Sequence, residues 1–375
     1  MIIRRINEII QRDFFKNKVL IITGARQVGK TTVVKSVVNS YGLEATYLNG
    51  DESDIHLIFK NPTSTRLKTL IGGSKVLVID EAQQIPNIGL SLKLIIDTYP
   101  EIQVIATGSS SFDIGNRINE PLTGRKLEYM MFPFSVSELV NHFGLLEEKR
   151  LLEHRLVFGT YPDVIMHQGN EVPILKNLVS SYLYRDVLQL EGIKRPALLT
   201  KILSALAYQV GSEVSINEVS QLVGSNSHTV EKYIDLLEKS FVIFRLPAFS
   251  RNMRNELKKS QKIYFYDNGV RNAVIGNYSA LINRTDAGAL WENYLMTERF
   301  KKLESSAFYG FRYFWRTTQM QEIDLIEEVD GKLSAFEFKW NPNSKKDKIP
   351  RSFTNHYPQA QTTIVTPENY MDFLL

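Results

Sequence analysis

One glycine-rich stretch near the N-terminus constrains the fold of this chain more than any other feature. It satisfies the pattern G-x-x-x-x-G-K-[ST], follows an apolar run at residues 19–22 and precedes a helical stretch. Glycines at the fixed positions let backbone N–H groups turn inward around an anion, and the dipole of the following helix adds positive potential. The context therefore predicts a phosphate-binding loop, made of Gly24, Ala25, Arg26, Gln27, Val28, Gly29, Lys30, Thr31 and Thr32.

Two of these side chains, and two more at the end of the strand expected at 75–80, suit ATP and Mg²⁺. Lys30 can reach the β- and γ-phosphates, and the Thr31 hydroxyl can coordinate Mg²⁺. An apolar run at residues 76–79 ends in Asp80 and Glu81, at the edge where open α/β sheets bind ligands. We expect Asp80 to hold the Mg²⁺ shell and Glu81 to act on the attacking water, by accepting its proton or by positioning it. A solvated pair of carboxylates is the alternative.

A third apolar run, at residues 104–107, is followed by polar and basic side chains. Thr107 and Ser109 are candidates for sensing the γ-phosphate, or they belong to an ordinary serine-rich turn. Arg117 and Arg125 come next, and an arginine here can stabilise transition-state charge in its own chain or from a neighbouring subunit. We favour Arg125, whose action in trans would require a homo-oligomer.

The rhythm of apolar residues changes along the chain. Continuous apolar strands alternate with helices through the first third, which indicates a parallel sheet covered on both faces, an α/β architecture. Residues 134–208 have helical spacing. The expected strands are 18–23, 45–48, 75–80, 102–107, 241–246, 262–266, 313–315, 323–328 and 334–339, and the expected helices include 30–40, 88–99, 227–239 and 287–303.

The length of 375 residues suits two or three domains. We predict a P-loop NTPase domain with a helical extension at residues 1–205, a winged-helix domain at 206–270 and a smaller α/β, restriction-endonuclease-like domain at 271–375. Basic residues number 45 and acidic residues 41, so the net charge of +4 permits a nucleic-acid partner without requiring one. The chain has no cysteine, and its N-terminus lacks the apolar core of a signal peptide. We expect a cytoplasmic protein without a membrane partner.

The winged-helix prediction starts from a capped helix. Ser215 can cap a short helix, with Glu218 three residues on, and a turn at Gly224 separates it from the helix at 227–239. Two strands would form the wing, although winged helices also serve as packing modules. The side chains expected to face a DNA groove are Ser225, Asn226, Ser227, His228 and Lys232.

The segment 245–262, which links the two wing strands and includes the end of one and the start of the other, is locally basic, with Glu256 as its one acidic residue. Such a cluster can contact DNA phosphates, or it can be an ordinary solvated loop. Its basic residues are Arg245, Arg251, Arg254, Lys258, Lys259 and Lys262.

Acidic and basic side chains also recur on two strands near the C-terminus. Glu337 and Lys339 lie on one face of a strand because side chains alternate, and a hairpin would place Asp324 beside them. Asp324 and Glu337 can hold a second divalent metal, and Lys339 can help activate water. Glu292, on a preceding helix, can add a carboxylate. An inactive relic, or ion pairs across a hairpin, is the alternative.

Segments spread over nearly the whole chain resemble the AAA-like ATPases of archaea and bacteria and their usual C-terminal domain. The resemblance implies ATP hydrolysis, with Glu81 as the catalytic residue after the Walker B Asp80. The C-terminal pattern of Asp324, Glu337 and Lys339 resembles the PD-(D/E)xK phosphodiesterase fold. The segments that carry the first resemblance are 24–32, 76–81, 107–110, 124–125, 132–135, 159–162, 184–186 and 264–269.

Together these patterns predict an ATPase that uses ATP and Mg²⁺, acts on DNA, and carries a nuclease-like domain whose ability to cleave is left open. Two alternatives remain. One is a signalling switch in which ATP controls a protein partner, and the other is a DNA-binding regulator with an inactive nuclease-like domain.

Overall fold

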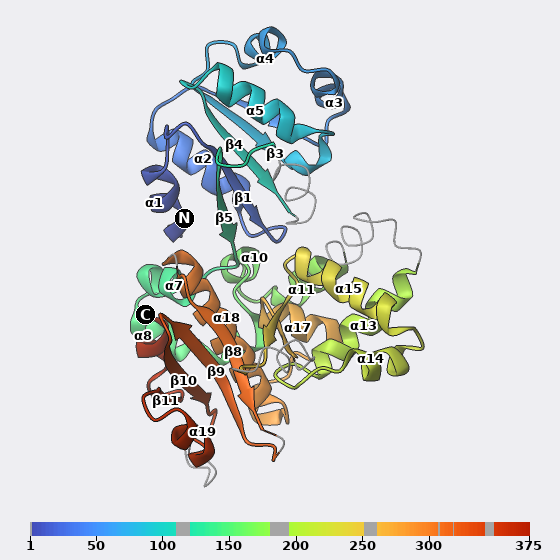
Figure 1. The fold of residues 1–375 in the computed structure, drawn as a ribbon, viewed down its shortest axis with the longest axis vertical. Coiled ribbons are helices and arrows are strands. Elements are labelled where there is room, and N and C mark those ends of the chain that lie inside the picture. The colour runs from blue at the N-terminus through green and yellow to red at the C-terminus, as the bar shows by residue number, and fades with distance from the viewer. Residues whose placement is uncertain are drawn as a thin grey trace. The chain divides into compact units, whose positions relative to one another are not determined.

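A computed structural model of the chain describes residues 2–109, 121–180, 195–250, 261–306, 308–317, 319–341 and 349–375. These residues form two compact units (Figure 1). The first comprises Met1–Phe134 with Lys239–Phe241, and the second comprises Ser135–Glu238 with Val242–Leu375. The helical stretch after residue 134, which we expected to extend the first domain, therefore groups with the second unit.

The first unit contains a five-stranded parallel sheet in the order β2-β3-β4-β1-β5. The four strands predicted in this region are confirmed to within about one residue at each end. The fifth, β5, was not predicted. The strands are β1 (Val19–Gly24), β2 (Ala45–Asn49), β3 (Val76–Asp80), β4 (Gln103–Gly108) and β5 (Lys126–Met131).

Helices cover both faces of this sheet, as the continuous apolar strands predicted. Val19 and Ile21 pack into a core with Leu92 of α5, whereas Leu20 and Ile22 are equally buried and point to the opposite face. On that face α2 contacts β1, β3 and β4. The helices are α1 (Arg5–Arg12), α2 (Lys30–Ser40), α3 (Ser53–Lys60), α4 (Ser64–Ile71), the 3-10 turn η1 (Ala82–Gln84) and α5 (Ile88–Thr98).

The second unit begins with helices and one two-stranded antiparallel sheet, β6-β7. The helix predicted at 227–239 is α15, and the two predicted wing strands are β6 and β7. The elements are α7 (Val136–Phe143), α8 (Leu145–Arg150), α9 (Leu152–Phe158), α10 (Pro162–Met166), α11 (Glu171–Leu178), α13 (Pro196–Tyr208), α14 (Ile216–Val223), α15 (Ser227–Lys239), β6 (Ile243–Pro247) and β7 (Gln261–Phe265).

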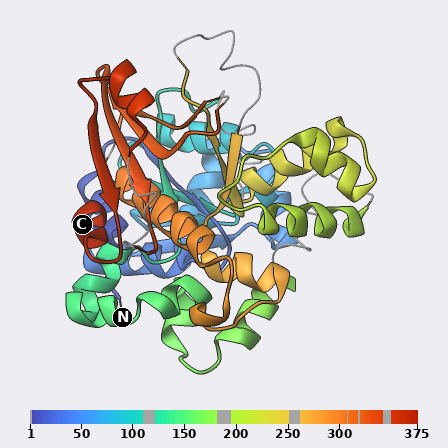
Figure 2. The ribbon, with the colours of Figure 1, turned by 90° about the horizontal axis from the view of Figure 1, so that it is seen from below.

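The rest of the second unit is a four-stranded mixed sheet with helices, in the order β11-β10-β9-β8. The strands β8, β9 and β10 are antiparallel neighbours, and β11 runs parallel to β10. The long helix α18 contacts β10 and α20 (Figure 2). The elements are α17 (Asn268–Ile275), η3 (Leu281–Asn283), α18 (Ala287–Ser305), β8 (Phe311–Arg316), β9 (Glu322–Val329), β10 (Lys332–Phe338), α19 (Arg351–His356), β11 (Gln361–Val365) and α20 (Tyr370–Leu374).

None of the helices in the described residues combines the length and the apolar character needed to span a bilayer.

Candidate functional site

The predicted phosphate-binding loop joins β1 to α2, and its backbone requires glycine. Gly24 has a φ of 151°, and a Cβ there would lie 2.1 Å from the carbonyl oxygen of Met131. Gly29 caps α2 in the left-handed conformation, with a φ of 94°, and supplies no side chain to the first N–H groups of the helix. Those groups at the N-terminus of α2 are suited to an anion.

Lys30 lies inside this loop. Its Nζ donates hydrogen bonds to the carbonyl oxygens of Gly24, at 2.8 Å, and Ala25, at 2.9 Å, and the residue is only 6% exposed. The ammonium is therefore held within the loop whose N–H groups would bind phosphate. This arrangement fits the role predicted for Lys30.

Asp80 lies next to Thr31 at the carboxyl end of the sheet. The Thr31 hydroxyl donates a 2.7 Å hydrogen bond to Asp80 Oδ2, and the Thr107 hydroxyl donates one to Oδ1. One carboxylate thus connects the loop after β1 to the ends of β3 and β4. A hydroxyl and a carboxylate held this close fit the oxygen ligands that Mg²⁺ prefers, so the predicted Thr31–Asp80 pair suits the metal. Thr107, a sensor candidate, contacts the same carboxylate.

Glu81 follows in a left-handed conformation, with a φ of 47°. Its Oε2 accepts hydrogen bonds from the Ser109 hydroxyl, at 3.1 Å, and from Gln83 Nε2. Gln83 Nε2 also donates to Ser109 Oγ at 3.2 Å, and both side chains are buried. Sequence reasoning missed Gln83, although its place two residues after Glu81 was a usable signal.

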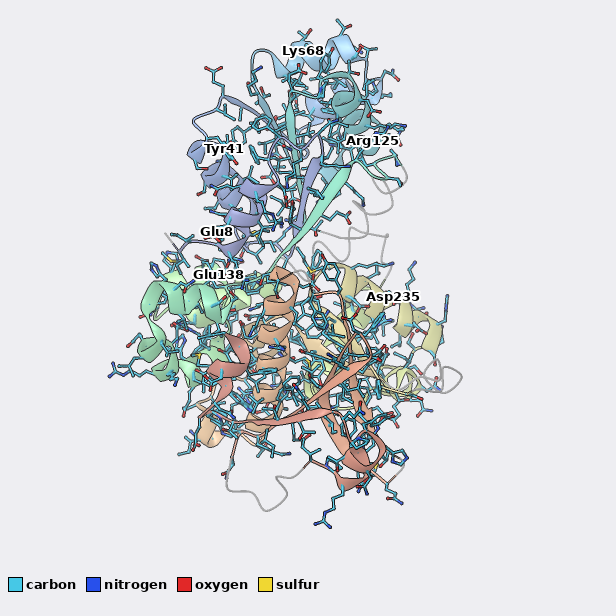
Figure 3. All side chains as sticks on the ribbon, turned by 60° about the vertical axis from the view of Figure 1, so that its left-hand side comes forward. Glu8, Tyr41, Lys68, Arg125, Glu138 and Asp235 are labelled. Atoms are coloured by element: carbon cyan, nitrogen blue, oxygen red, sulfur yellow. The ribbon has the colours of Figure 1, made fainter. Side chains whose placement is uncertain are left out.

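Arg125 is not close to the loop of its own chain. It precedes β5, and its carbonyl oxygen accepts a hydrogen bond from the N–H of Val19 at the start of β1. The loop is at the other end of β1, roughly 17 Å away at the usual rise per residue. The side chain, labelled in Figure 3, instead pairs with Asp97 at 2.7 Å. Arg125 is therefore too far from the loop to stabilise transition-state charge in its own chain, and its action on a neighbouring subunit stays a prediction. Arg117 lies outside the described residues.

The predicted elements of the winged helix are present in the second unit. The Ser215 hydroxyl accepts the N–H of Glu218 at 3.4 Å, and Gly224 ends α14 with a φ of 68°. Of the side chains expected to face DNA, Asn226, His228 and Lys232 are exposed, whereas Ser225 and Ser227 are partly buried. The winged-helix assignment itself stays a prediction.

Two members of the predicted basic cluster, Arg245 and Lys262, lie in the described residues, and both have other partners in the chain. Arg245 pairs with Asp235 and with Glu238, whose carboxylate lies 3.4 Å away. Lys262 is fully buried in β7. The Arg245 guanidinium and the Lys262 ammonium are therefore not available to contact a DNA phosphate. The other four, Arg251, Arg254, Lys258 and Lys259, lie outside the described residues.

The predicted hairpin near the C-terminus is confirmed. Strands β9 and β10 pair with Leu325 opposite Phe336, and the N–H of Phe338 donates to Asp324 Oδ2 at 2.8 Å. Lys339 Nζ lies 2.7 Å from Glu337 Oε1, as expected for side chains on one face. Yet among the described residues no group of three or more His, Cys, Asp or Glu side chains is arranged to hold a metal ion. The second metal therefore stays a prediction.

Two carboxyl groups near this hairpin have altered acidity. Burial raises the pKa of Glu292 to about 7, against the opposing effect of Lys262. Burial also raises the pKa of Glu337 to about 7; the Asp324 carboxylate adds to the rise, and Lys339 opposes it. Both carboxyl groups are therefore less acidic than an exposed glutamate.

The segments 159–162 and 264–269, which carried part of the family resemblance, meet in the second unit. The N–H of Thr160 donates to Asp267 Oδ2 at 2.7 Å, and a Cβ on Gly159 would lie 2.1 Å from the other carboxylate oxygen. Burial raises the pKa of Asp267 to about 6, although several backbone N–H groups favour the charged form. Glycine at 159 is therefore a packing requirement. The segment 184–186 lies outside the described residues.

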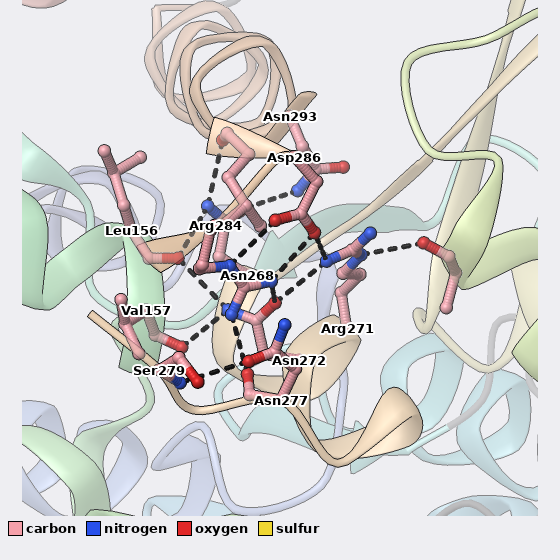
Figure 4. Close-up of polar contacts among 12 residues, drawn as sticks. Leu156, Val157, Asn268, Arg271, Asn272, Asn277, Ser279, Arg284, Asp286 and Asn293 are labelled. Carbon is pink, nitrogen blue, oxygen red and sulfur yellow. Dashed lines mark hydrogen bonds and ion pairs between the residues drawn. The ribbon is translucent and has the colours of Figure 1, made fainter. Parts of the chain in front are cut away.

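A buried polar network continues from this contact (Figure 4). Asn268 Nδ2 donates to the carbonyl oxygens of Leu156, at 3.1 Å, and Leu290, at 3.0 Å. Arg271 and Arg284 both bind Asp286, at 2.5 and 2.8 Å. The network connects α9, α17 and α18, and thereby stabilises the second unit.

Three family models match successive parts of the chain. Residues 16–140 match the AAA domain. This segment contains the phosphate-binding loop, Asp80 and Glu81, so the first unit has an AAA-type P-loop fold. Residues 149–280 and 287–372 match two domains of unknown function, DUF8612 and DUF4143.

Several curated proteins are similar over most of the chain. An uncharacterised protein of Mycobacterium tuberculosis is 27% identical over 371 residues, which cover 96% of this chain and 78% of that protein. Another, of Methanocaldococcus jannaschii, is 22% identical over 314 residues, covering 78% and 69%.

Solved structures also align with the chain. A DNA replication initiation factor aligns at 16% identity, over 62% of this chain and 86% of its own, with a TM-score of 0.29. The Thermotoga maritima RuvB Holliday junction branch migration motor aligns at 15% identity, over 69% and 95%, with a TM-score of 0.35.

Proposed function

We propose that this chain hydrolyses ATP, with Mg²⁺, at the carboxyl end of the five-stranded sheet. The observation that carries the proposal is the Thr31–Asp80 hydrogen bond of 2.7 Å, beside a loop that already holds the Lys30 ammonium. The match to the AAA domain over residues 16–140 supports the same activity.

Each side chain has a distinct task in this proposal. Lys30 and the N–H groups of the loop bind the phosphates, and Thr31 and Asp80 hold the metal. Mg²⁺, when bound, neutralises charge on the β- and γ-phosphates. Glu81, held by two donors on Oε2, orients the attacking water or accepts its proton with the oxygen that remains.

The test is Lys30→Ala, compared with Lys35→Ala on the exposed side of the same helix. Phosphate release from ATP in magnesium buffer should disappear in Lys30→Ala and persist in Lys35→Ala. Circular dichroism would check that both variants fold. Hydrolysis that survives in a folded Lys30→Ala protein would refute the assignment.

We propose further that the second unit contacts DNA through the start of α15. Asn226, His228 and Lys232 are exposed there and follow a short helix and a glycine turn, an arrangement that suits groove binding. The basic cluster contributes less support than expected, since Arg245 and Lys262 have carboxylate partners in the chain.

Binding to a DNA duplex across a salt series tests this second proposal. A steep loss of affinity with salt indicates phosphate contacts. Lys232→Ala should weaken binding and reduce the salt dependence, whereas Lys201→Ala, also exposed but on α13, should not. If DNA does not bind at low salt, the signalling switch controlled by ATP becomes the better explanation.

The metal-dependent nuclease is the third hypothesis, and the β9–β10 hairpin is the observation in its favour. Plasmid cleavage with Mg²⁺ or Mn²⁺, compared with Asp324→Ala, tests it. Loss of cleavage in that variant would support a nuclease, and no cleavage with either metal would support the inactive relic.

A further inference from the structure

A lysine from outside the nuclease-like sheet enters its acidic cluster. Lys262, on β7, has a side chain that is 1% exposed, and its Nζ lies 2.8 Å from Glu292 Oε1 and 3.5 Å from Asp324 Oδ1. It also pairs with Glu322 of β9. One ammonium therefore lies among three carboxylates that come from α18 and β9.

Further donors reach the carboxylates of this cluster, but not every oxygen has one. The Tyr264 hydroxyl donates, at 2.7 Å, to the same Glu292 Oε1 that Lys262 contacts, and the N–H of Phe338 donates to Asp324. Lys339 pairs with Glu337 at 2.7 Å, whereas Glu337 Oε2 is buried without a hydrogen-bond partner among the described residues. Each carboxylate in the predicted metal site thus already has a positive or N–H or O–H partner within the chain.

The Lys262 ammonium is also fixed in place by the backbone around it. The Asn293 side chain on α18 accepts the N–H of Phe265 at 2.8 Å and donates to its carbonyl oxygen at 3.0 Å. The Thr297 hydroxyl donates to the same carbonyl oxygen at 2.9 Å. These bonds attach the end of β7 to α18, which also carries Glu292, so the lysine and its carboxylate belong to one rigid arrangement.

We propose that the Lys262 ammonium takes the place of a divalent cation between Glu292, Glu322 and Asp324. Buried carboxylates require a nearby positive charge, and an ammonium has three N–H donors to distribute among them. A divalent ion needs six or more oxygen ligands at 2.0–2.6 Å as a general rule, and at this position it would meet the ammonium as a like charge. The residues therefore do not fit a metal while Lys262 remains among them.

Two consequences follow, and neither depends on ATP hydrolysis. The native cluster does not take up a divalent metal. The nuclease-like domain is then inactive, as in the alternative of a relic that does not cleave. Removal of the ammonium leaves Glu292 and Asp324 without the cation that the structure places beside them, whereas Glu322 keeps Arg316 at 3.6 Å. Lys262→Met, which keeps most of the side-chain volume, should therefore create a divalent cation site.

Mn²⁺ binding, followed by the electron paramagnetic resonance signal of free Mn²⁺, tests the proposal without a nuclease assay. All proteins would carry Asp80→Asn and contain no nucleotide, so that the P-loop site does not contribute. The parent protein should bind no Mn²⁺ in the cluster. Lys262→Met should bind Mn²⁺ at least about ten-fold more tightly than the parent, and adding Asp324→Asn should abolish the gain.

Lys339→Met is the matched control, because it removes one positive charge from the same neighbourhood but leaves Lys262 in place. An equal gain in Lys339→Met would overturn the proposal, since net charge alone would then explain the binding. Failure of a folded Lys262→Met protein to bind Mn²⁺ would also overturn it. If Lys262→Met does not fold, Mn²⁺ binding by the parent protein tests the proposal. Binding that Asp324→Asn removes would refute the proposal, and absence of binding would support it.

Discussion

The hydroxyl of Thr31, in the first turn of α2, donates a 2.7 Å hydrogen bond to the carboxylate of Asp80 at the end of β3, 49 residues away in the sequence. The parallel sheet makes this contact because the carboxyl ends of β1 and β3 meet at one edge. Asp80 is held from a second side by the Thr107 hydroxyl. A metal ligand fixed by two neighbours is pre-organised, so its replacement should affect turnover more than folding.

Asp80→Asn should lower ATP turnover by about 100-fold or more, because the amide supplies no charge for Mg²⁺. Asp51→Asn, at an exposed position soon after β2, is the matched control and should leave turnover unchanged. Steady-state phosphate release over a range of Mg²⁺ concentrations measures both. Equal rates for the two variants would show that Asp80 has no role at the metal.

Gln83 and Ser109 should act as positioning residues for Glu81, because both donate to its Oε2. Gln83→Leu should lower kcat by about ten-fold and leave ATP affinity unchanged, since the carboxylate survives but its orientation is lost. Glu81→Gln, which removes the carboxylate itself, should lower kcat by about 10²–10⁴-fold.

Gln84→Leu, one residue further on, provides the control for the Gln83 experiment, because only its backbone N–H bonds to Glu81. A combined Gln83→Leu and Ser109→Ala variant should approach the rate of Glu81→Gln. A purely structural role for Gln83 would instead change ATP affinity and kcat together. Nucleotide titration beside steady-state kinetics distinguishes these outcomes.

Gly24→Ala should disrupt the first unit, because its Cβ would lie 2.1 Å from a backbone oxygen of β5 and its φ is 151°. We expect a loss of about 3 kcal/mol or more in the free energy of unfolding, together with loss of ATP binding. Gly73→Ala is the control within the same unit, since a Cβ there meets nothing within 4 Å. Thermal unfolding by circular dichroism compares the two, and equal stability would contradict the close approach at Gly24.

The local parts of this molecule could be predicted from sequence, and the contacts between distant segments could not. The loop at Gly24 and the strand before Asp80 have strong signals, because four or more apolar residues in a row must be buried. Strand β5 was missed because Lys126 and Glu128 interrupt its apolar pattern, as expected at a sheet edge.

Lys262 shows where sequence reasoning fails. Its neighbours in sequence are basic, so it was assigned to a cluster that would contact phosphate, and no local rule places it among carboxylates from α18 and β9. The position of Arg125 was equally hidden from the sequence: it lies at the start of β5, at the edge of the parallel sheet opposite the P-loop, so only the prediction of a role in trans remains. Both cases concern tertiary position, which periodicity does not encode.

Asp286→Asn should destabilise the second unit in a pH-dependent way. Burial alone would raise the pKa of Asp286, but hydrogen bonds from Arg284 and Arg271 outweigh it and lower the pKa to about 2, from the usual 3.8. Stabilisation from a depressed pKa is present above the unfolded value and is lost as the pH falls through the folded one. The free energy of unfolding of the native protein should therefore exceed that of Asp286→Asn by about 2 kcal/mol at pH 6, and this difference should vanish near pH 2.

Denaturant unfolding followed by tryptophan fluorescence suits this test, because the three tryptophans, Trp291, Trp315 and Trp340, all belong to the second unit. Asp163→Asn, at an exposed carboxylate in the same unit, should change stability by no more than about 0.5 kcal/mol at either pH. A difference between native protein and Asp286→Asn that stays constant from pH 6 to pH 2 would mean that lost packing, rather than the two arginine contacts, explains the effect.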